Sequence, residues 1–99
     1  MGLLDTALPA EERQIAADAL KPFEAEGIQF HALRTRVAGA RRFVSLHVLV
    51  PGSWTVKQGH DLCESLELAI AQSLPGTFVF THLEPLEDPA SWADQSLER

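Results

Sequence analysis

Residues 27–52 read GIQFHALRTRVAGARRFVSLHVLVPG, and this stretch decides the fold. Its second half ends at Pro51-Gly52 and is rich in residue types that favour strands. These residues are Phe43, Val44, Leu46, Val48, Leu49 and Val50. The first half is more mixed and places Arg34 and Arg36 on one face of an extended chain. The stretch therefore predicts two strands joined by a turn at Gly39.

The length of that turn decides which side chains of the hairpin face each other. A turn of three or five residues centred on Gly39 pairs His31 directly with His47. A two-residue turn shifts the pairing by one residue and sends the two histidines to opposite faces of the sheet. The sequence leaves both registers open, and a site shared by these two histidines depends on the first.

Helical patterns flank the hairpin on both sides. Pro9 and the acidic residues after it predict a helix from Ala10 to Glu26, with Pro22 as a kink or an early end. Ser53 or Thr55 is expected to cap a second helix, which Pro75-Gly76 closes. The apolar side chains of this second helix recur at helical spacing, at Val56, Cys63, Leu66, Ile70 and Leu74.

A third strand is predicted in TFVFTHLEPLEDP, which begins at Thr77. The resulting order is α-β-β-α-β. This order predicts an α+β fold, a two-layer sandwich with two helices on one face of a three-stranded sheet. We divide the chain into a linker-like segment (residues 1–8), the folded domain (residues 9–86) and an acidic tail (residues 87–99) with one helical turn around Trp92.

Length and charge limit the classes of protein to which the chain can belong. Its 99 residues, 45% of them hydrophobic, suit a single domain. The net charge of −6 argues against a nucleic-acid partner, because phosphate binding needs a basic face. The single cysteine excludes an internal disulfide, and no apolar run is long enough to insert into a membrane. Without a signal-peptide pattern, a cytoplasmic location is expected.

The four histidines form the constellation that carries chemical information. His82 and Glu84 are two residues apart, so they share a face at the end of the third strand. His47 interrupts an otherwise apolar strand, and His60 borders the apolar stripe of the second helix. Imidazoles with a carboxylate suit Zn²⁺, and also Mn²⁺, Fe²⁺, Co²⁺ or Ni²⁺. Taken singly, each histidine fits an ordinary surface or hydrogen-bonded role better than a ligand role.

Other chemistry has weaker support in the residues. Cys63 fits buried packing better than a role as ligand or nucleophile, because it lies on the apolar stripe. Serine-nucleophile patterns and phosphate loops are missing from the sequence. A small metalloenzyme is disfavoured because the chain is too short to enclose much of a substrate pocket. We therefore predict that the protein is not an enzyme.

Three segments carry a resemblance to a known family: FHALRTRVAGARRFVSLHVLV, GHDLCESLELAIAQSLPG and VFTHLEP. From about Pro9 to Pro85 they resemble the C-terminal cytoplasmic domain of the cation diffusion facilitator family of divalent-metal exporters. This resemblance implies a metallochaperone-like fold, a V-shaped homodimer and regulatory metal ions near the dimer interface. Zn²⁺ is the expected ion, and Cd²⁺ is a further alternative. The resemblance also implies a set of metal ligands: His31, His47, His60, His82 and Glu84.

The chain departs from the family's pattern in two ways. Glu84 stands where the family commonly has the aspartate that bridges two ions. The transmembrane domain that carries transport in the family is missing, so the chain by itself cannot move an ion across a membrane. A stand-alone product and an excised fragment both fit, and Met1 tilts the expectation toward the former.

Two hypotheses of different kinds follow. The first is a cytoplasmic, zinc-binding homodimer that regulates, senses or buffers metal in connection with cation efflux. The second is a metal-independent dimerisation or protein-interaction module, whose partner is for example a full-length cation diffusion facilitator.

Overall fold

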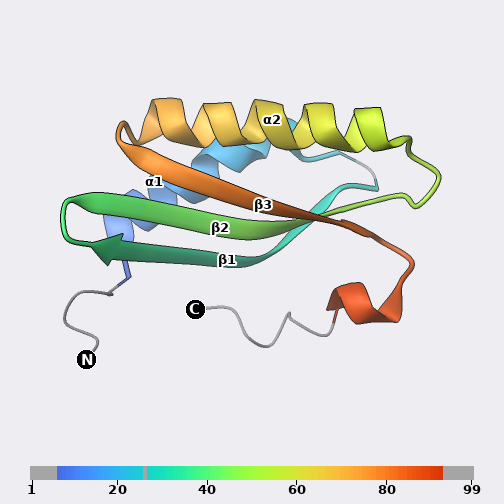
Figure 1. Ribbon diagram of the computed structural model, residues 1–99, viewed down its shortest axis with the longest axis horizontal. Coiled ribbons are helices and arrows are strands. Elements are labelled where there is room, and N and C mark those ends of the chain that lie inside the picture. The colour runs from blue at the N-terminus through green and yellow to red at the C-terminus, as the bar shows by residue number, and fades with distance from the viewer. Residues whose placement is uncertain (1–6, 26, 93–99) are drawn as a thin grey trace.

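The computed structural model describes residues 7–25 and 27–92 (Figure 1). Both α-helices lie on one face of a three-stranded sheet, and a short 3₁₀ turn follows the last strand. This confirms the predicted α+β fold with two layers. The elements are α1 (Ala10–Leu20), η2 (Lys21–Phe23), β1 (Gln29–Ala38), β2 (Arg41–Val50), α2 (Val56–Ser73), β3 (Thr77–Pro85) and η3 (Pro89–Trp92).

The sheet is mixed, with the strand order β1-β2-β3. The β1–β2 hairpin is antiparallel, whereas β2 and β3 run parallel. A parallel pair needs a crossover connection, and α2 supplies it. Both α-helices pack on the same side, so within the described chain the opposite side of the sheet carries no α-helix (Figure 1). We call this side the open face.

Helix α1 ends earlier than the sequence predicted. It runs only to Leu20, and Lys21–Phe23 form a 3₁₀ turn instead of the expected helix as far as Glu26. The cause is Pro22, which lacks the N–H that would continue the helical ladder and whose ring disfavours a further turn. The Glu26 end of the prediction lies outside the described residues.

Helix α2 begins at a capping box built by Thr55 and Gln58. The Gln58 N–H donates to Thr55 Oγ1 at 3.1 Å, and the Thr55 N–H donates to Gln58 Oε1 at 2.8 Å. Thr55, one of the two predicted caps, therefore satisfies backbone groups that a helix start leaves open. Val56 was expected in the apolar stripe of this helix, but it is 86% exposed. The first turn of α2 therefore lies outside the core.

The core lies between the sheet and the two helices. Alternate residues of β2 point into it and are fully buried, as are the apolar residues of α2 that face the sheet. The fully buried members are Leu8, Ala16, Val44, Leu46, Val48, Leu66 and Ile70. This alternation leaves Phe43, Ser45, His47 and Leu49 on the open face.

The hairpin adopts the first of the two registers left open by the sequence, in which His31 pairs with His47, but by an unexpected route. Its turn has two residues, because Ala38 pairs with Arg41. Such a turn alone would place the histidines on opposite faces. A β-bulge between His31 and Arg34 shifts the register back by one residue, and Ala32 within it has a φ of +54°. His31 and His47 are therefore direct partners.

The C-terminal part of the described chain forms the η3 turn, in agreement with the helical turn expected around Trp92. Residues 93–99 of the predicted tail lie outside the described residues. Within the described part of the chain, the helices are too short or too polar to cross a bilayer.

Candidate metal centre

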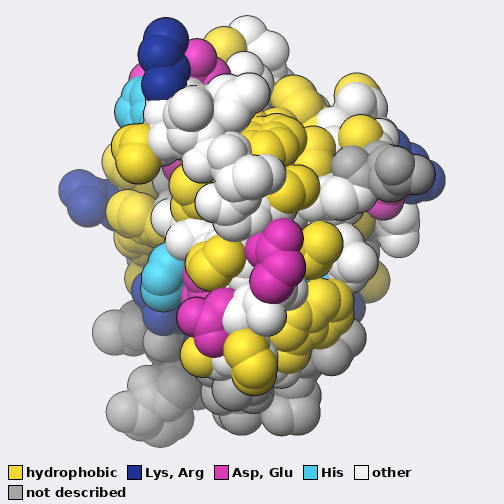
Figure 2. Space-filling model, turned by 90° about the vertical axis from the view of Figure 1, so that its right-hand side faces the viewer, with side chains coloured by type: hydrophobic (Ala, Val, Ile, Leu, Met, Phe, Trp, Pro, Cys, Tyr) yellow, Lys and Arg dark blue, Asp and Glu magenta, His cyan; other side chains and the backbone are white. Residues whose placement is uncertain are grey.

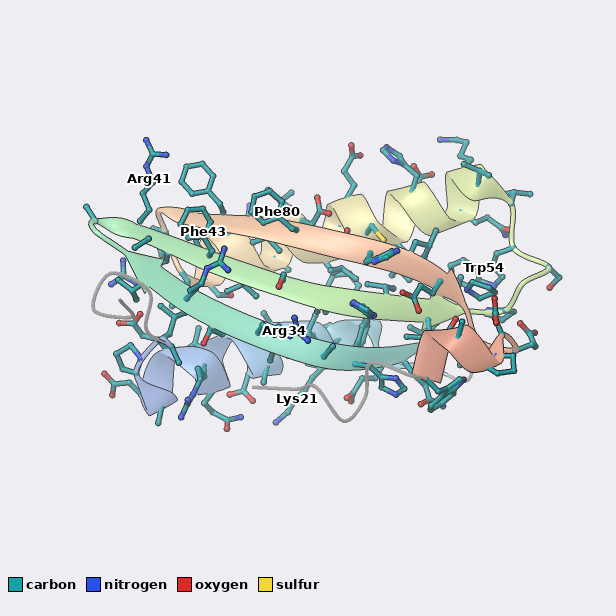
Figure 3. All side chains as sticks on the ribbon, turned by 60° about the horizontal axis from the view of Figure 1, so that its bottom comes forward. Lys21, Arg34, Arg41, Phe43, Trp54 and Phe80 are labelled. Carbon is teal, nitrogen blue, oxygen red and sulfur yellow. The ribbon has the colours of Figure 1, made fainter. Side chains whose placement is uncertain are left out.

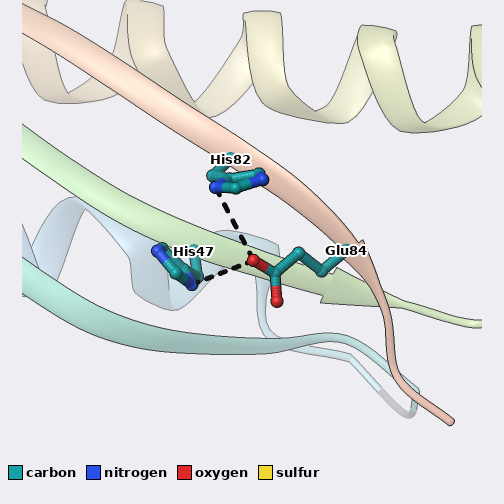
Figure 4. A group of neighbouring side chains, drawn as sticks. All are labelled: His47, His82 and Glu84. Carbon is teal, nitrogen blue, oxygen red and sulfur yellow. Dashed lines mark ion pairs between the residues drawn. The ribbon is translucent and has the colours of Figure 1, made fainter. Parts of the chain in front are cut away.

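His47, His82 and Glu84 converge on the open face of the sheet (Figure 4). The parallel register makes His47 of β2 and His82 of β3 direct neighbours. Glu84 lies two residues beyond His82 and therefore projects from the same face. Backbone pairing between two strands thus positions all three side chains, and no loop residue is needed to complete the group.

The distances within this group are those of ligands around one ion. Glu84 Oε2 lies 3.2 Å from His47 Nδ1 and 3.6 Å from His82 Nδ1. The two imidazole ring centres are 5.0 Å apart. Two ligand atoms on a tetrahedral zinc ion are about 3.4 Å apart when each bond is about 2.1 Å long. Small side-chain rotations therefore suffice to place the three donor atoms around a zinc ion.

Burial strengthens the electrostatics of the group. The side chains of His47 and Glu84 are only 18% and 15% exposed, whereas that of His82 is largely open to solvent. Glu84 Oε1 is buried and has no hydrogen-bond partner among the described residues. A buried carboxylate oxygen without a partner is costly, and a bound cation is one way to compensate it. Figure 2 shows histidine and acidic side chains on this end of the molecular surface, among hydrophobic ones.

His31 lies beside this group but is not part of it. Although it is the direct partner of His47 in the hairpin, its ring contacts Trp92 edge to face, with 4.6 Å between ring centres. The residue is 7% exposed, and its Nδ1 atom is buried without a hydrogen-bond partner among the described residues. The sequence contained no signal for the Trp92 contact, because it depends on how the C-terminal turn folds back.

His60 lies elsewhere in the protomer. It is exposed on α2, in the helical layer, whereas His47 and His82 project from the open face. Its Nε2 atom is 3.3 Å from Glu64 Oε2, and Asp61 completes a second, fully exposed group of potential ligands. Sequence reasoning did not identify Glu64, although its spacing of four residues from His60 on a helix is the signal that predicts this pair.

Cys63 is buried under α2, as its place on the apolar stripe predicted. Burial raises the pKa of its thiol above the ordinary value; a hydrogen bond with Thr81 opposes this effect and the nearby Glu67 carboxylate adds to it. Thr81 in turn donates a hydrogen bond to Glu67. The thiol is therefore kept protonated at neutral pH, which suits packing better than metal ligation.

The hairpin end of the open face carries a patch of aromatic and arginine side chains (Figure 3). Phe43 stacks with Phe78 and Phe80, at ring-centre distances of 5.6 and 6.4 Å. The guanidinium groups of Arg36 and Arg41 lie over the rings of Phe43 and Phe78. Phe78 and Phe80 are about half exposed. The sequence alone does not reveal this patch, because the stacking depends on the pairing of β2 with β3.

Comparison with known proteins gives a consistent result. Residues 8–86 match the family model described as cation efflux protein, cytoplasmic domain. The chain is 54% identical over 90 residues to the uncharacterised transporter sll1263 of Synechocystis, and 38% identical over 84 residues to the cation-efflux pump FieF of Serratia proteamaculans. These matches cover 91% and 84% of this chain but only 29% and 27% of the relatives. The chain thus spans less than a third of their length.

Solved structures show the same fold. A structure of CzrB is 39% identical, with a TM-score of 0.69, and the match covers 79% of this chain and 96% of the CzrB chain. A zinc form of CzrB is 36% identical, with a TM-score of 0.68, and the match covers 83% and 93% of the two chains.

Proposed function

The chain belongs to the cation efflux proteins, as the cytoplasmic domain of that family, and from this premise we propose that it binds divalent metal ions as a homodimer and so regulates, senses or buffers metal in connection with cation efflux. One observation carries the proposal. Two imidazoles and a carboxylate meet on the open face, and the remaining carboxylate oxygen, Glu84 Oε1, is buried without a hydrogen-bond partner among the described residues.

The donor atoms favour a zinc-like ion. Imidazole nitrogen and carboxylate oxygen are ligands that Zn²⁺ accepts at distances compatible with this group, and Mn²⁺, Fe²⁺, Co²⁺, Ni²⁺ and Cd²⁺ are alternatives that the same ligands accept. His47, His82 and Glu84 would hold the ion directly. The zinc form of CzrB supports this choice, since CzrB is 36% identical to the chain.

We propose that His31 and His60 also bind this ion, and that each reaches it by a different route. His31 is the direct strand partner of His47, so a change of rotamer brings its ring toward the ion. His60 projects from the helical layer, so a second protomer is the natural source of this ligand. A homodimer that packs across the β3 edge of the sheet, beside α2, brings His60 of one protomer toward the metal group of its partner, and it also covers the exposed phenylalanines of β3.

Metal binding then regulates through the dimer. An ion held by ligands from both protomers binds more tightly to the relative orientation in which all ligands reach it. A ligand shifts a conformational equilibrium by its differential affinity for the two states. The ion therefore favours one angle between the protomers, and this angle is the output that the rest of an efflux protein can read.

Calorimetry and small-angle scattering test the proposal together. Chelator-stripped protein is titrated with zinc, and the scattering curve is recorded before and after. We expect a saturable heat and a more compact dimer, both lost in a His47→Ala/His82→Ala variant. Lys57→Ala, an exposed substitution on α2, serves as the control that leaves the strand ligands intact. Binding should weaken as the pH falls, because protons compete with the ion for the imidazole nitrogens. Equal zinc affinity in the wild type and the double variant would refute the proposal.

The aromatic and arginine patch supports a second function, a metal-independent interaction module. Half-exposed Phe78 and Phe80 next to arginine side chains are typical of the centre of a protein interface. The partner is a second copy of the chain or a full-length cation efflux protein. This hypothesis predicts a dimer whose mass, measured by light scattering, is unchanged by chelator and reduced by Phe80→Ser. A dimer that forms only with metal excludes it.

A further inference from the structure

The C-terminal turn η3 lies beyond the part of the chain that the family model matches, which ends at residue 86. Four hydrogen bonds shape this turn and join it to the end of the sheet. The Leu86 N–H donates to Val50 O at 2.8 Å, and Glu87 Oε1 accepts from the Gly52 N–H at 2.9 Å. Ser91 Oγ donates to Pro85 O at 2.7 Å, and Trp92 Nε1 donates to Leu86 O at 2.8 Å.

These bonds place Trp92 against a predicted metal ligand. Ser91 is buried, Trp92 is half-buried, and the Trp92 ring meets the His31 ring at 4.6 Å and 64°. The turn thus folds back toward the first strand at the end of the sheet that also carries the metal group (Figure 1). Leu49, on the open face at this end, is 0% exposed, so this part of the face is covered whereas Phe78 and Phe80 are not.

The two rings of the His31–His47 pair therefore have different neighbours. The His47 ring contacts that of His82, and the His31 ring contacts that of Trp92. His31 Nδ1 is buried without a hydrogen-bond partner among the described residues, so in this position the imidazole loses a hydrogen bond that water would give it. An ion beside His47 offers this nitrogen a partner, but the His31 ring must leave Trp92 to reach it.

We propose that Trp92 is a positioning residue that holds His31 out of the metal centre, so that binding of an ion by His31 and release of Trp92 occur together. The C-terminal turn acts as a latch: its ring contact competes with the ion for one imidazole. This inference rests on the proposed metal centre of His47, His82 and Glu84, and it adds a residue outside the ligand set that sets the affinity of that centre.

The competition has a defined consequence for affinity. Trp92→Leu removes the ring contact and frees His31, so zinc should bind about three- to tenfold more tightly, which is the factor expected for loss of one aromatic pair. Trp92→Phe keeps a ring at this position and should behave like the wild type. In a His31→Ala background, Trp92→Leu should leave the affinity unchanged, because no imidazole remains to be released.

Tryptophan fluorescence reports the release directly. In a Trp54→Phe background, Trp92 is the single tryptophan of the chain. Zinc does not quench by redox or paramagnetic routes, so a change in emission reports a change around the ring. We expect the Trp92 emission to change along the zinc titration with the midpoint seen by calorimetry. The change should disappear in Trp54→Phe/His31→Ala, which still binds zinc through the remaining ligands.

The two readouts separate this inference from the proposed function. Zinc heat together with unchanged Trp92 emission overturns the latch and leaves the metal centre standing. The same holds if Trp92→Leu binds zinc no more tightly than the wild type, or if its effect persists without His31. Absence of any zinc heat in the wild type overturns the metal centre itself, and the latch with it.

Discussion

Glu84→Gln removes one negative charge from the proposed metal centre while nearly preserving the shape of the side chain. In the wild type, Glu84 Oε2 is 3.2 Å from His47 Nδ1 and 3.6 Å from His82 Nδ1, so both imidazoles share this carboxylate. We expect the variant to bind zinc roughly 100-fold more weakly than the wild type, because a neutral amide no longer attracts the divalent ion.

The magnitude follows from the position of the carboxylate. Two unit charges about 4 Å apart interact by about 4 kcal/mol at an effective dielectric constant near 20, and a divalent ion doubles this value. Loss of hydration by a side chain that is only 15% exposed offsets a large share of the gain. A neutral amide oxygen also retains weak ligand character. The net loss is then about 3 kcal/mol, which corresponds to roughly 100-fold in Kd.

Isothermal titration calorimetry on chelator-stripped protein at neutral pH measures the effect. The matched control is Glu24→Gln, which makes the same change of charge at an exposed position just after η2, away from the histidines. The control should bind zinc like the wild type. Affinity of Glu84→Gln within threefold of the wild type would refute direct ligation. An equal loss in both variants would assign the effect to net charge instead.

Three further predictions concern the framework of the site. Leu66→Ala should lower the free energy of unfolding by about 2–5 kcal/mol, because Leu66 is fully buried, whereas Val56→Ala at an exposed position should change it little; urea denaturation compares the two. Thr55→Ala should cost about 1 kcal/mol in the same assay, because it removes the cap of α2, and Thr55→Ser should restore most of it. The raised pKa of Cys63 means that the folded protein holds the thiol proton more tightly than the unfolded chain does. Its contribution to stability is therefore complete below the unfolded pKa and is lost as pH rises through the higher folded value. Iodoacetamide should accordingly alkylate Cys63 at a higher pH in native protein than in urea, and coincident profiles would contradict this.

Much of the fold could be predicted from local patterns. The alternation of apolar residues in β2 and the apolar stripe of α2 are periodic patterns. Such patterns can be recognised within a short segment, without knowledge of the rest of the chain. Thr55 was recognisable as one of two candidate caps for the same reason. Local patterns were less reliable at the end of α1, where a helix was expected as far as Glu26 but Pro22 ends it early.

The candidate site was likewise predictable only where it depends on local spacing. The spacing of His82 and Glu84 is enough to place both side chains on one face of an extended strand. Their meeting with His47 required the parallel register of β2 and β3, which involves residues 35 positions apart and is set by packing across α2. The contact of His31 with Trp92 was not predictable, because Trp92 approaches through a folded-back turn. The pairing of His60 with Glu64 could have been inferred from their spacing of four residues on a helix.

By itself, then, the sequence determined the element order, the two layers and the residue types available to hold a metal ion. Only the tertiary structure decided that His31 faces His47. The two-residue turn would have separated them, and the bulge restores the pairing by holding Ala32 at a φ of +54°. For a residue with a Cβ atom this conformation costs about 1–2 kcal/mol, so no local preference selects it. Burial of the surrounding strand residues on both sides of the bulge outweighs that cost, and this burial exists only once the whole sheet has formed.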